Sequence, residues 1–136
     1  MNRVLKITRV LTLPCQSLAN FSRLSDLKVS CTIPEEAVIS CSIGRATLDI
    51  TTDKIDGDTA YKATLVMNWC PDELPKRRMA YLCELTDGSH LLLGTPNSPY
   101  PVAEAGEKHT RLGDRQTPTR EVTVTWTDRF PPSEIV

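Results

Sequence analysis

The chain has 136 residues, enough for one domain that buries about two thirds of the surface its unfolded form would expose. Its 40% hydrophobic and 24% charged residues are ordinary, whereas 10 prolines and 5% aromatic residues favour a loop-rich β protein over a helical bundle. A formal net charge of −1 provides no overall attraction for nucleic acid or an anionic membrane, so binding to either would need a local patch.

The first residues, MNRVLKITRVLTLP, resemble a secretion signal only superficially, because Lys6 and Arg9 interrupt the apolar run that a signal requires. No window approaches about 18 uninterrupted apolar residues. We therefore expect a mature strand at the start of the chain and no membrane span.

The cysteines and histidines do not form a ligand pattern. The five cysteines make an odd count, contain no Cys-x-x-Cys pair and fall where the apolar face of a strand is expected; they are Cys15, Cys31, Cys41, Cys70 and Cys83. His90 and His109 have no second ligand at short spacing. We predict free thiols, a reducing cytoplasm as the place of synthesis, and neither a metal site nor a cofactor.

Residues 3–27 begin with a strand. Residues 3–13 alternate between apolar and polar with period two, with Leu5, Ile7, Leu11 and Leu13 on one face and Arg9 as an exception to the pattern. From 14 to 27 the spacing of Leu18, Phe21 and Leu24 suggests a short helix or turn, with Ser17 as a possible cap.

Residues 28–93 continue the two-residue period. The clearest strand is 61–69, and 79–85 with 90–94 should form a hairpin about Asp87-Gly88, a strong turn signal. With a last strand at 121–127, the alternation predicts about eight strands; they are 3–13, 28–33, 37–43, 45–52, 61–69, 79–85, 90–94 and 121–127.

This pattern predicts a mainly β protein: an antiparallel β-sandwich or barrel with at most one short helix and a long extended loop. It should be a single domain, 1–136, with the extended loop at 94–120 and a C-terminal tail at 128–136. The inward-facing residues of the best strands should form one apolar cluster of Leu65, Met67, Trp69, Leu82, Val124 and Trp126. Leu82 is out of phase with Tyr81, Cys83 and Leu85, and a slip of one residue would move it to the other face.

The segment 94–120 has 27 residues with four prolines, three glycines and seven charges, and no helical or strand period. Such a loop is usually functional or disordered. It has too few apolar groups to order itself, so contacts with a partner protein would be the economical source of order. A floppy surface loop is the alternative.

No catalytic pattern is present. Ser89 and His90 are neighbours on opposite sides of a strand and cannot act as nucleophile and base for each other. The acidic pairs Glu35-Glu36 and Asp72-Glu73 lie beside prolines at turns, where solvated charge is the ordinary explanation. Phosphate-binding glycine loops are missing from the sequence. The sequence thus predicts a protein that is not an enzyme.

A nucleic-acid-binding barrel is a weaker alternative. Lys76, Arg77 and Arg78 form the one tight basic run. Binding of single strands also needs exposed aromatic rings. The strand aromatics Tyr61, Trp69, Tyr81 and Trp126 all fall on the apolar, inward side of their strands.

Two stretches of the C-terminal half resemble a known group of proteins. The stretch YLCELTDGSHLLLGTPNSPYP (81–101), followed after a variable loop by EVTVTWT (121–127), resembles a pattern in small proteins encoded among the virion structural genes of tailed bacteriophages and prophages. The resemblance covers only the C-terminal half. It implies a β-rich neck or tail subunit, such as a terminator, stopper or connector ring protein, without catalytic residues or cofactor.

The same resemblance implies partners and a location. The partners would be other virion structural proteins and copies of the chain itself, and the protein would reside in the virion after synthesis in the bacterial cytoplasm. We expect the anchors of this interface to be Tyr100 and Phe130, with Arg111, Arg115 and Arg120 supplying charge. The alternative function is a carbohydrate- or protein-binding β-module.

Overall fold

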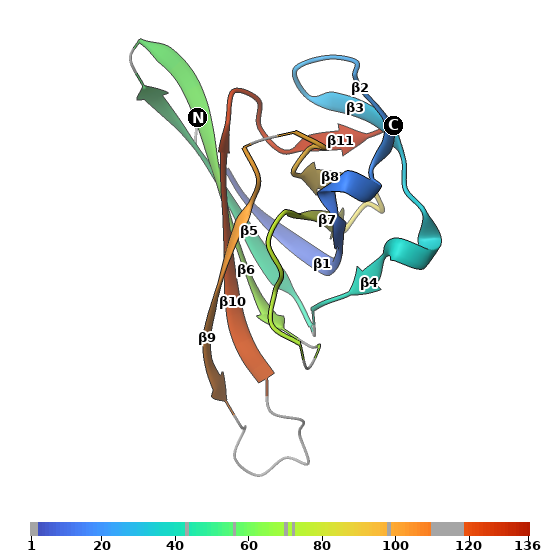
Figure 1. The fold of residues 1–136 in the computed structure, drawn as a ribbon. Helices are drawn as coiled ribbons and strands as arrows, with labels where there is room; N and C mark the ends of the chain where they lie inside the picture. The colour runs from blue at the N-terminus through green and yellow to red at the C-terminus, as the bar shows by residue number, and fades with distance from the viewer. Residues whose placement is uncertain are drawn as a thin grey trace.

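The computed structural model describes residues 3–42, 44–55, 57–69, 71, 73–97, 99–109 and 119–136. Within these residues, eleven strands form one mixed sheet that is not closed (Figure 1). The strands are β1 (Arg3–Pro14), β2 (Ala19–Arg23), β3 (Lys28–Thr32), β4 (Ile39–Ser40), β5 (Ala46–Ile55), β6 (Asp58–Trp69), β7 (Met79–Leu85), β8 (His90–Leu93), β9 (Val102–His109), β10 (Thr119–Asp128) and β11 (Ser133–Ile135). The predicted mainly β fold is confirmed.

The order of strands across the sheet is β2-β3-β11-β8-β7-β1-β5-β6-β10-β9, with β4 paired to β1. Every pairing is antiparallel except that of β11 with β3. In Figure 1 the long strands β5, β6, β10 and β9 lie together on the left, and the shorter strands β7, β8, β11, β3 and β2 lie to their right. The sheet is one continuous structure rather than two separate sheets.

A bulge in β1 explains why Arg9 breaks the alternation. The pairing of β1 with β7 shifts between Ile7 and Arg9, where β1 contains one residue more than its partner. An extra residue inverts the facing of the residues that follow it. Leu5 and Ile7 therefore face the first apolar cluster, as does Val10, whereas Leu11 and Leu13 face a second one.

The two apolar clusters lie on opposite faces of β7. Tyr81 and Cys83 join the first, which contains the buried residues of β5, β6 and β10, while Ala80 and Leu82 join the second, beneath β3 and β8. Five of the six predicted core residues, Leu65, Met67, Trp69, Val124 and Trp126, do share one cluster. The placement of Leu82 among them was wrong, because successive residues of a strand point to opposite faces and β7 is buried on both.

Of the short helix or turn expected at 14–27, the structure has only a turn. The chain makes one turn of 3-10 helix at Cys15–Ser17 and then enters β2, which pairs with β3. Ser17 belongs to the 3-10 turn and is not its cap. The apolar spacing of Leu18 and Phe21 arises because both side chains pack on the second cluster from an extended chain. The expected strand 37–43 is reduced to β4, after a 3-10 turn at Glu35–Ala37.

The prediction that 94–120 is without strand structure was wrong for residues 102–109. These residues form β9, which pairs with β10 from Val102↔Thr125 to His109↔Thr119. Backbone hydrogen bonds between strands need no apolar side chain, so a sequence poor in apolar groups can still be ordered by pairing. Ala103 adds a contact with the first cluster, and the indole Nε1 of Trp126 donates to the Pro99 carbonyl oxygen at 3.0 Å.

The C-terminal segment is likewise part of the sheet. β11 pairs in parallel with β3 and antiparallel with β8, so it connects the β2–β3 hairpin to the rest of the sheet. Ile135 packs against the second cluster. Residues 133–135 of the C-terminal tail expected at 128–136 are therefore ordered by pairing within the chain itself.

Candidate functional site

A groove with basic residues on one wall is the main candidate for a binding site. One wall is the segment Pro75, Lys76, Arg77 and Arg78, and the other is Tyr100, Pro101, Val102 and Ala103; together they enclose about 430 Å³. We call this the basic groove. It brings the one basic run of the sequence beside Tyr100, although the two are far apart along the chain.

The walls of the basic groove are shaped by proline and glycine. Pro75 and Pro101 lie within the walls, and proline cannot donate a backbone hydrogen bond to a neighbouring strand. Gly94, at the end of the β7–β8 hairpin, has φ +112, and a Cβ there would lie 3.2 Å from Pro101 and 3.3 Å from Ala80. Only glycine lets the 94–101 connection approach β7 so closely.

Arg78 lies in the left-handed region of the backbone, with φ 58. This conformation is unfavourable for a residue with a Cβ. Two contacts hold it: its carbonyl oxygen accepts a hydrogen bond from the Cys15 amide at 2.8 Å, and its guanidinium lies 5.4 Å from the centre of the Tyr100 ring. Strained residues that the fold holds in place often mark binding sites.

Among the residues that the structure describes, little negative charge compensates the basic groove. Lys76 contacts Glu73 at 3.7 Å, but both side chains are exposed, so the pair is weak. Arg77 and Arg78 are exposed and form no ion pair with the residues that the structure describes. The groove therefore favours a ligand with negative charge.

The second wall of the basic groove opens onto a free sheet edge. β9 is the last strand in the sheet order, and its one partner among the described strands is β10. Val102 is 60% exposed. The pairing shifts between Arg120 and Val122, so β9 has a bulge between Ala105 and Lys108. The straight, pairable part of this edge is therefore 102–105.

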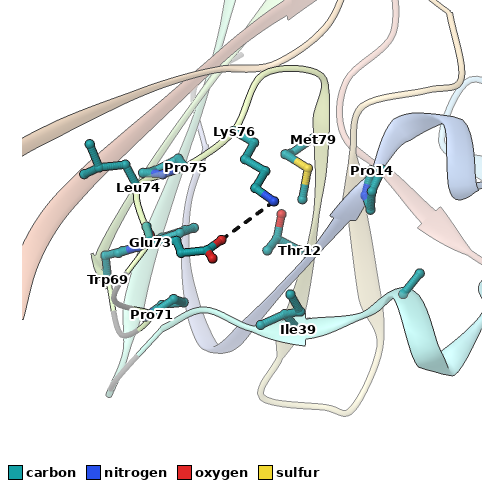
Figure 2. A pocket seen from close by; sticks show the side chains of 11 residues that line it. Thr12, Pro14, Ile39, Trp69, Pro71, Glu73, Leu74, Pro75, Lys76 and Met79 are labelled. Atoms are coloured by element: carbon teal, nitrogen blue, oxygen red, sulfur yellow. Dashed lines mark hydrogen bonds and ion pairs between the residues drawn. The ribbon is translucent and has the colours of Figure 1, made fainter.

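An apolar pocket lies on the other side of the same loop (Figure 2). It encloses about 230 Å³, shares Pro75 and Lys76 with the basic groove, and is lined mainly by apolar side chains that include Trp69, Leu74 and Met79. The indole Nε1 of Trp69 donates to the Glu73 carbonyl oxygen at 2.7 Å and so fixes the loop against β6. Ile39 and Leu74, at its margin, are 56% and 55% exposed.

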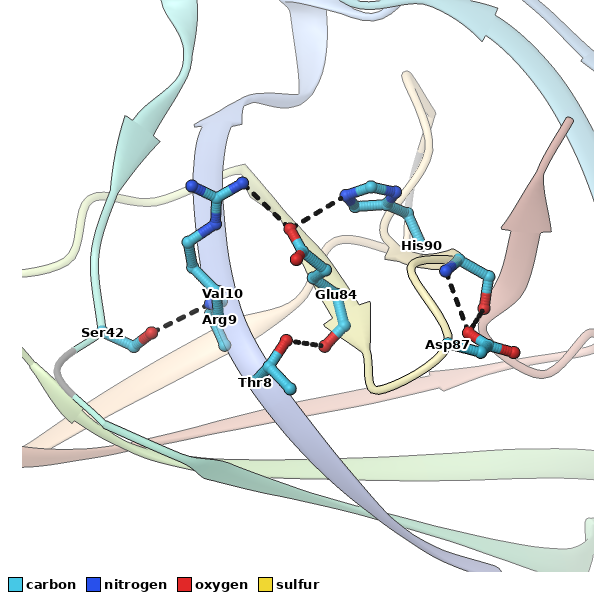
Figure 3. Close-up of polar contacts among 8 residues, drawn as sticks. Thr8, Arg9, Val10, Ser42, Glu84, Asp87 and His90 are labelled. Atoms are coloured by element: carbon cyan, nitrogen blue, oxygen red, sulfur yellow. Dashed lines mark hydrogen bonds and ion pairs between the residues drawn. The ribbon is translucent and has the colours of Figure 1, made fainter.

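A third hollow, of about 430 Å³, lies over the second cluster between Leu11, Leu82 and Ile135, with Glu35 and His90 at its border. Beside it, His90 Nε2 and Arg9 Nη2 both approach Glu84 Oε2, at 3.4 and 2.9 Å (Figure 3). The Ser89 hydroxyl donates to Asp87 Oδ1 at 2.6 Å, which lowers the pKa of Asp87. Ser89 and His90 thus have separate partners in the described structure.

The structure does not gather the expected interface residues into one site. Tyr100 lines the basic groove, whereas Phe130 packs beneath the guanidinium of Arg23 in β2, 4.0 Å from the ring centre. Arg120 pairs with Trp69 and Lys108 in the sheet, and its Nε is buried without a hydrogen-bond partner among the described residues. Arg111 and Arg115 lie outside the described residues.

The basic groove was not predicted as a unit from the sequence. The signal was present, because a run of three basic residues follows two prolines in CPDELPKRR. That run and Tyr100 are 22 or more positions apart in the chain, and only the packing of 94–101 on β7 brings them together. Nothing in the sequence pattern predicted that Ile39 and Leu74 would be exposed.

Comparison with known proteins identifies no relatives: no protein-family model matches the chain, and no curated protein or solved structure is significantly similar to it. Among the described residues, no helix has the length and apolar character needed to cross a membrane. Within the same residues, no three His, Cys, Asp or Glu side chains are grouped so that they could hold a metal ion.

Proposed function

We propose that the chain is a non-enzymatic structural subunit of a tailed-phage or prophage virion. It would be a neck or tail component, such as a terminator, stopper or connector ring protein. Its partners would be other virion structural proteins and further copies of the chain. The resemblance of 81–101 and 121–127 to virion proteins supports this proposal, and those residues lie in β7, β8, β10 and the wall of the basic groove.

The observation that carries the proposal is the free edge of β9 beside the basic groove. An unpaired strand edge offers backbone donors and acceptors to another protein chain, and natural proteins usually protect such edges unless they are used. The adjoining apolar pocket, with Ile39 and Leu74 exposed at its margin, provides apolar contact next to the polar one. An apolar centre with a charged surround is the usual composition of a protein interface.

The expected assembly can be tested by size-exclusion chromatography with light scattering, followed by negative-stain imaging. A shortened variant sharpens the test: residues 110–118, which lie between β9 and β10, are replaced by a short Gly-Ser link. The fold should survive, because a change in loop length alters the free energy of unfolding only slightly. Self-assembly or incorporation into particles should fail if Arg111 and Arg115 contribute contacts.

A larger deletion of 103–117 is the comparison, because it also removes most of β9 and the packing of Ala103 on the first cluster. It should lower stability as well as assembly. If the 110–118 variant assembles like the parent, the role assigned to Arg111 and Arg115 is lost. If the parent is strictly monomeric and binds no virion protein, the structural-subunit proposal fails and a carbohydrate- or protein-binding module becomes the better assignment.

A further inference from the structure

We propose that the basic groove binds an extended, acidic segment of a partner protein, which adds to the free edge of β9 as a further strand. This inference rests on the proposed function, because it names the chemistry of the partner that would hold the subunit in an assembly. Its two supports are the geometry of the sheet edge and the charge of the opposite wall.

The order of the described strands ends at β9, which packs against the first cluster through Ala103. Ala103, in one wall of the basic groove, packs against the first cluster, as does Met79, the residue that follows Arg78 of the other wall. The described backbone of 75–78 makes no hydrogen bond to β9; the bond that is present joins the Arg78 carbonyl oxygen to Cys15. The groove is therefore a gap beside an unpaired strand edge, which is the geometry that strand addition requires.

The positive charge of the groove indicates which side chains the added strand should carry. Lys76, Arg77 and Arg78 are exposed on one wall, and Arg77 and Arg78 lack an ion pair with the described part of the chain. Side chains of a strand alternate between its two faces. A segment with a carboxylate at every second position could thus direct its acidic face at the basic wall, while its backbone pairs with Val102–Ala105.

A protein strand fits this site better than single-stranded nucleic acid. Nucleic acid needs an extended basic track and free aromatic faces on which bases can stack. Here the track is one run of three residues, and the guanidinium of Arg78 already lies over the Tyr100 ring. The unpaired backbone of β9 complements the hydrogen-bonding edge of a peptide.

The first experiment measures binding of a fluorescein-labelled peptide, TEVEVET, to the full chain by fluorescence anisotropy. Binding should be saturable, and the basic control peptide TKVKVKT should bind at least about 10-fold more weakly, equivalent to about 1.4 kcal/mol. The double variant Lys76→Glu with Arg77→Glu should reverse this preference. Its matched control is Lys6→Glu with Lys62→Glu, two exposed lysines of β1 and β6 outside the groove, which should leave the preference unchanged.

A second pair of peptides separates strand addition from simple charge attraction. N-methylation of residues 2, 4 and 6 of TEVEVET removes donors from one edge of the strand, and N-methylation of residues 3 and 5 removes them from the other. Strand addition predicts that one of these peptides binds at least about 10-fold more weakly than the other. Equal binding of the two would overturn the strand-addition geometry.

Other outcomes of the peptide-binding experiments would overturn the inference. Absence of TEVEVET binding, or unchanged binding by the Lys76→Glu, Arg77→Glu variant, overturns the inference, and tight binding of oligo(dT) in its place would assign the groove to nucleic acid. Light scattering of the same variants keeps the two proposals apart. A parent that assembles without binding the peptide refutes only this inference, whereas a parent that binds the peptide but is strictly monomeric and binds no virion protein refutes the structural-subunit proposal.

Discussion

At the scale of single residues, Trp69 provides the clearest test of the core. Its side chain is 6% exposed, lies in the first cluster and donates to Glu73. Replacement of Trp69 with Ala should lower the free energy of unfolding by about 3–5 kcal/mol, because it leaves a large cavity. Urea denaturation measures this change. A loss below about 1 kcal/mol would mean that the indole is not packed as described.

The backbone of Arg78 provides a second residue-scale prediction. Arg78→Gly and Arg78→Ala both remove the guanidinium beside Tyr100, but only the alanine variant keeps a Cβ at positive φ. We expect the glycine variant to be more stable by about 0.5–1 kcal/mol, the cost of a left-handed Cβ less the extra freedom of glycine in the unfolded chain.

The matched pair for this comparison is Arg77→Gly and Arg77→Ala. Arg77 is not among the described residues with positive φ, so alanine should be the more stable replacement there. The measurement is urea denaturation of all four variants. Greater stability of Arg78→Ala than of Arg78→Gly would contradict the assigned backbone conformation.

At the scale of elements, prediction from sequence succeeded where side chains decide the structure. Buried and partly buried residues alternate in β6 from Ala63 to Trp69 and in β10 from Val122 to Trp126, and the β7–β8 hairpin turns at Gly88, which has φ 89. β2, β9 and β11 were missed because they are held mainly by backbone pairing at or near sheet edges, which leaves little periodic pattern. Leu82 was assigned to the wrong cluster because β7 has apolar residues on both of its faces.

The role of β11 predicts the effect of a small truncation. Removal of 133–136 eliminates the strand that joins β3 to β8, the contact of Ser133 with Arg23 at 3.0 Å and the packing of Ile135. We expect the β2–β3 hairpin to separate from the sheet while β5, β6 and β10 remain folded. Amide hydrogen exchange should then show lost protection in 28–32 and retained protection in 61–69.

The control for the truncation is removal of Val136 alone, which is 68% exposed; it removes the hydrogen bond from the Val136 amide to the Val29 carbonyl oxygen but no acceptor of an amide in 28–32, and it keeps Glu134, which pairs with Lys28 and Leu91. Its exchange pattern should match that of the parent. Equal protection of 28–32 in the longer truncation and in this control would show that β3 does not depend on β11.

At the scale of the whole molecule, the buried thiols make stability sensitive to alkaline pH. Burial raises the pKa of Cys15 to about 11 from 9.0, and burial also raises the pKa of Cys83 and of the Tyr81 hydroxyl. The folded chain therefore keeps these protons at pH values where the unfolded chain releases them. The resulting stabilisation is complete below about pH 9 and is lost as the pH rises through the folded pKa values.

We thus expect a free energy of unfolding that is steady up to about pH 8.5 and falls above about pH 9. Urea denaturation at a series of pH values measures the fall. Cys15→Ala should be less stable at every pH, but its decline between about pH 9 and 11 should be shallower than that of the parent. Parallel declines would show that Cys15 does not titrate as its burial implies.

The sequence predicted the state of the thiols better than it predicted the residues of the binding site. The described cysteines Cys15, Cys31 and Cys83 are free as expected, whereas Cys70 lies outside the described residues. Of the expected interface residues, Tyr100 does line a groove, but Phe130 packs on Arg23 within the chain. The interface anchors were predicted from residue type, and this prediction succeeded only in part. An aromatic residue in a polar segment can pack against its own chain as readily as against a partner.

The position of β11 in the sheet has a consequence for synthesis. β3 ends at Thr32, and the strand that connects it to β8 begins at Ser133, so about a hundred residues must leave the ribosome before β3 can be joined. At about 5–20 residues per second, this interval is roughly 5–20 s. During that time Val29, Leu18 and Cys15 lack the cover that the finished sheet provides, and the nascent chain depends on chaperones or on fast elongation to avoid aggregation.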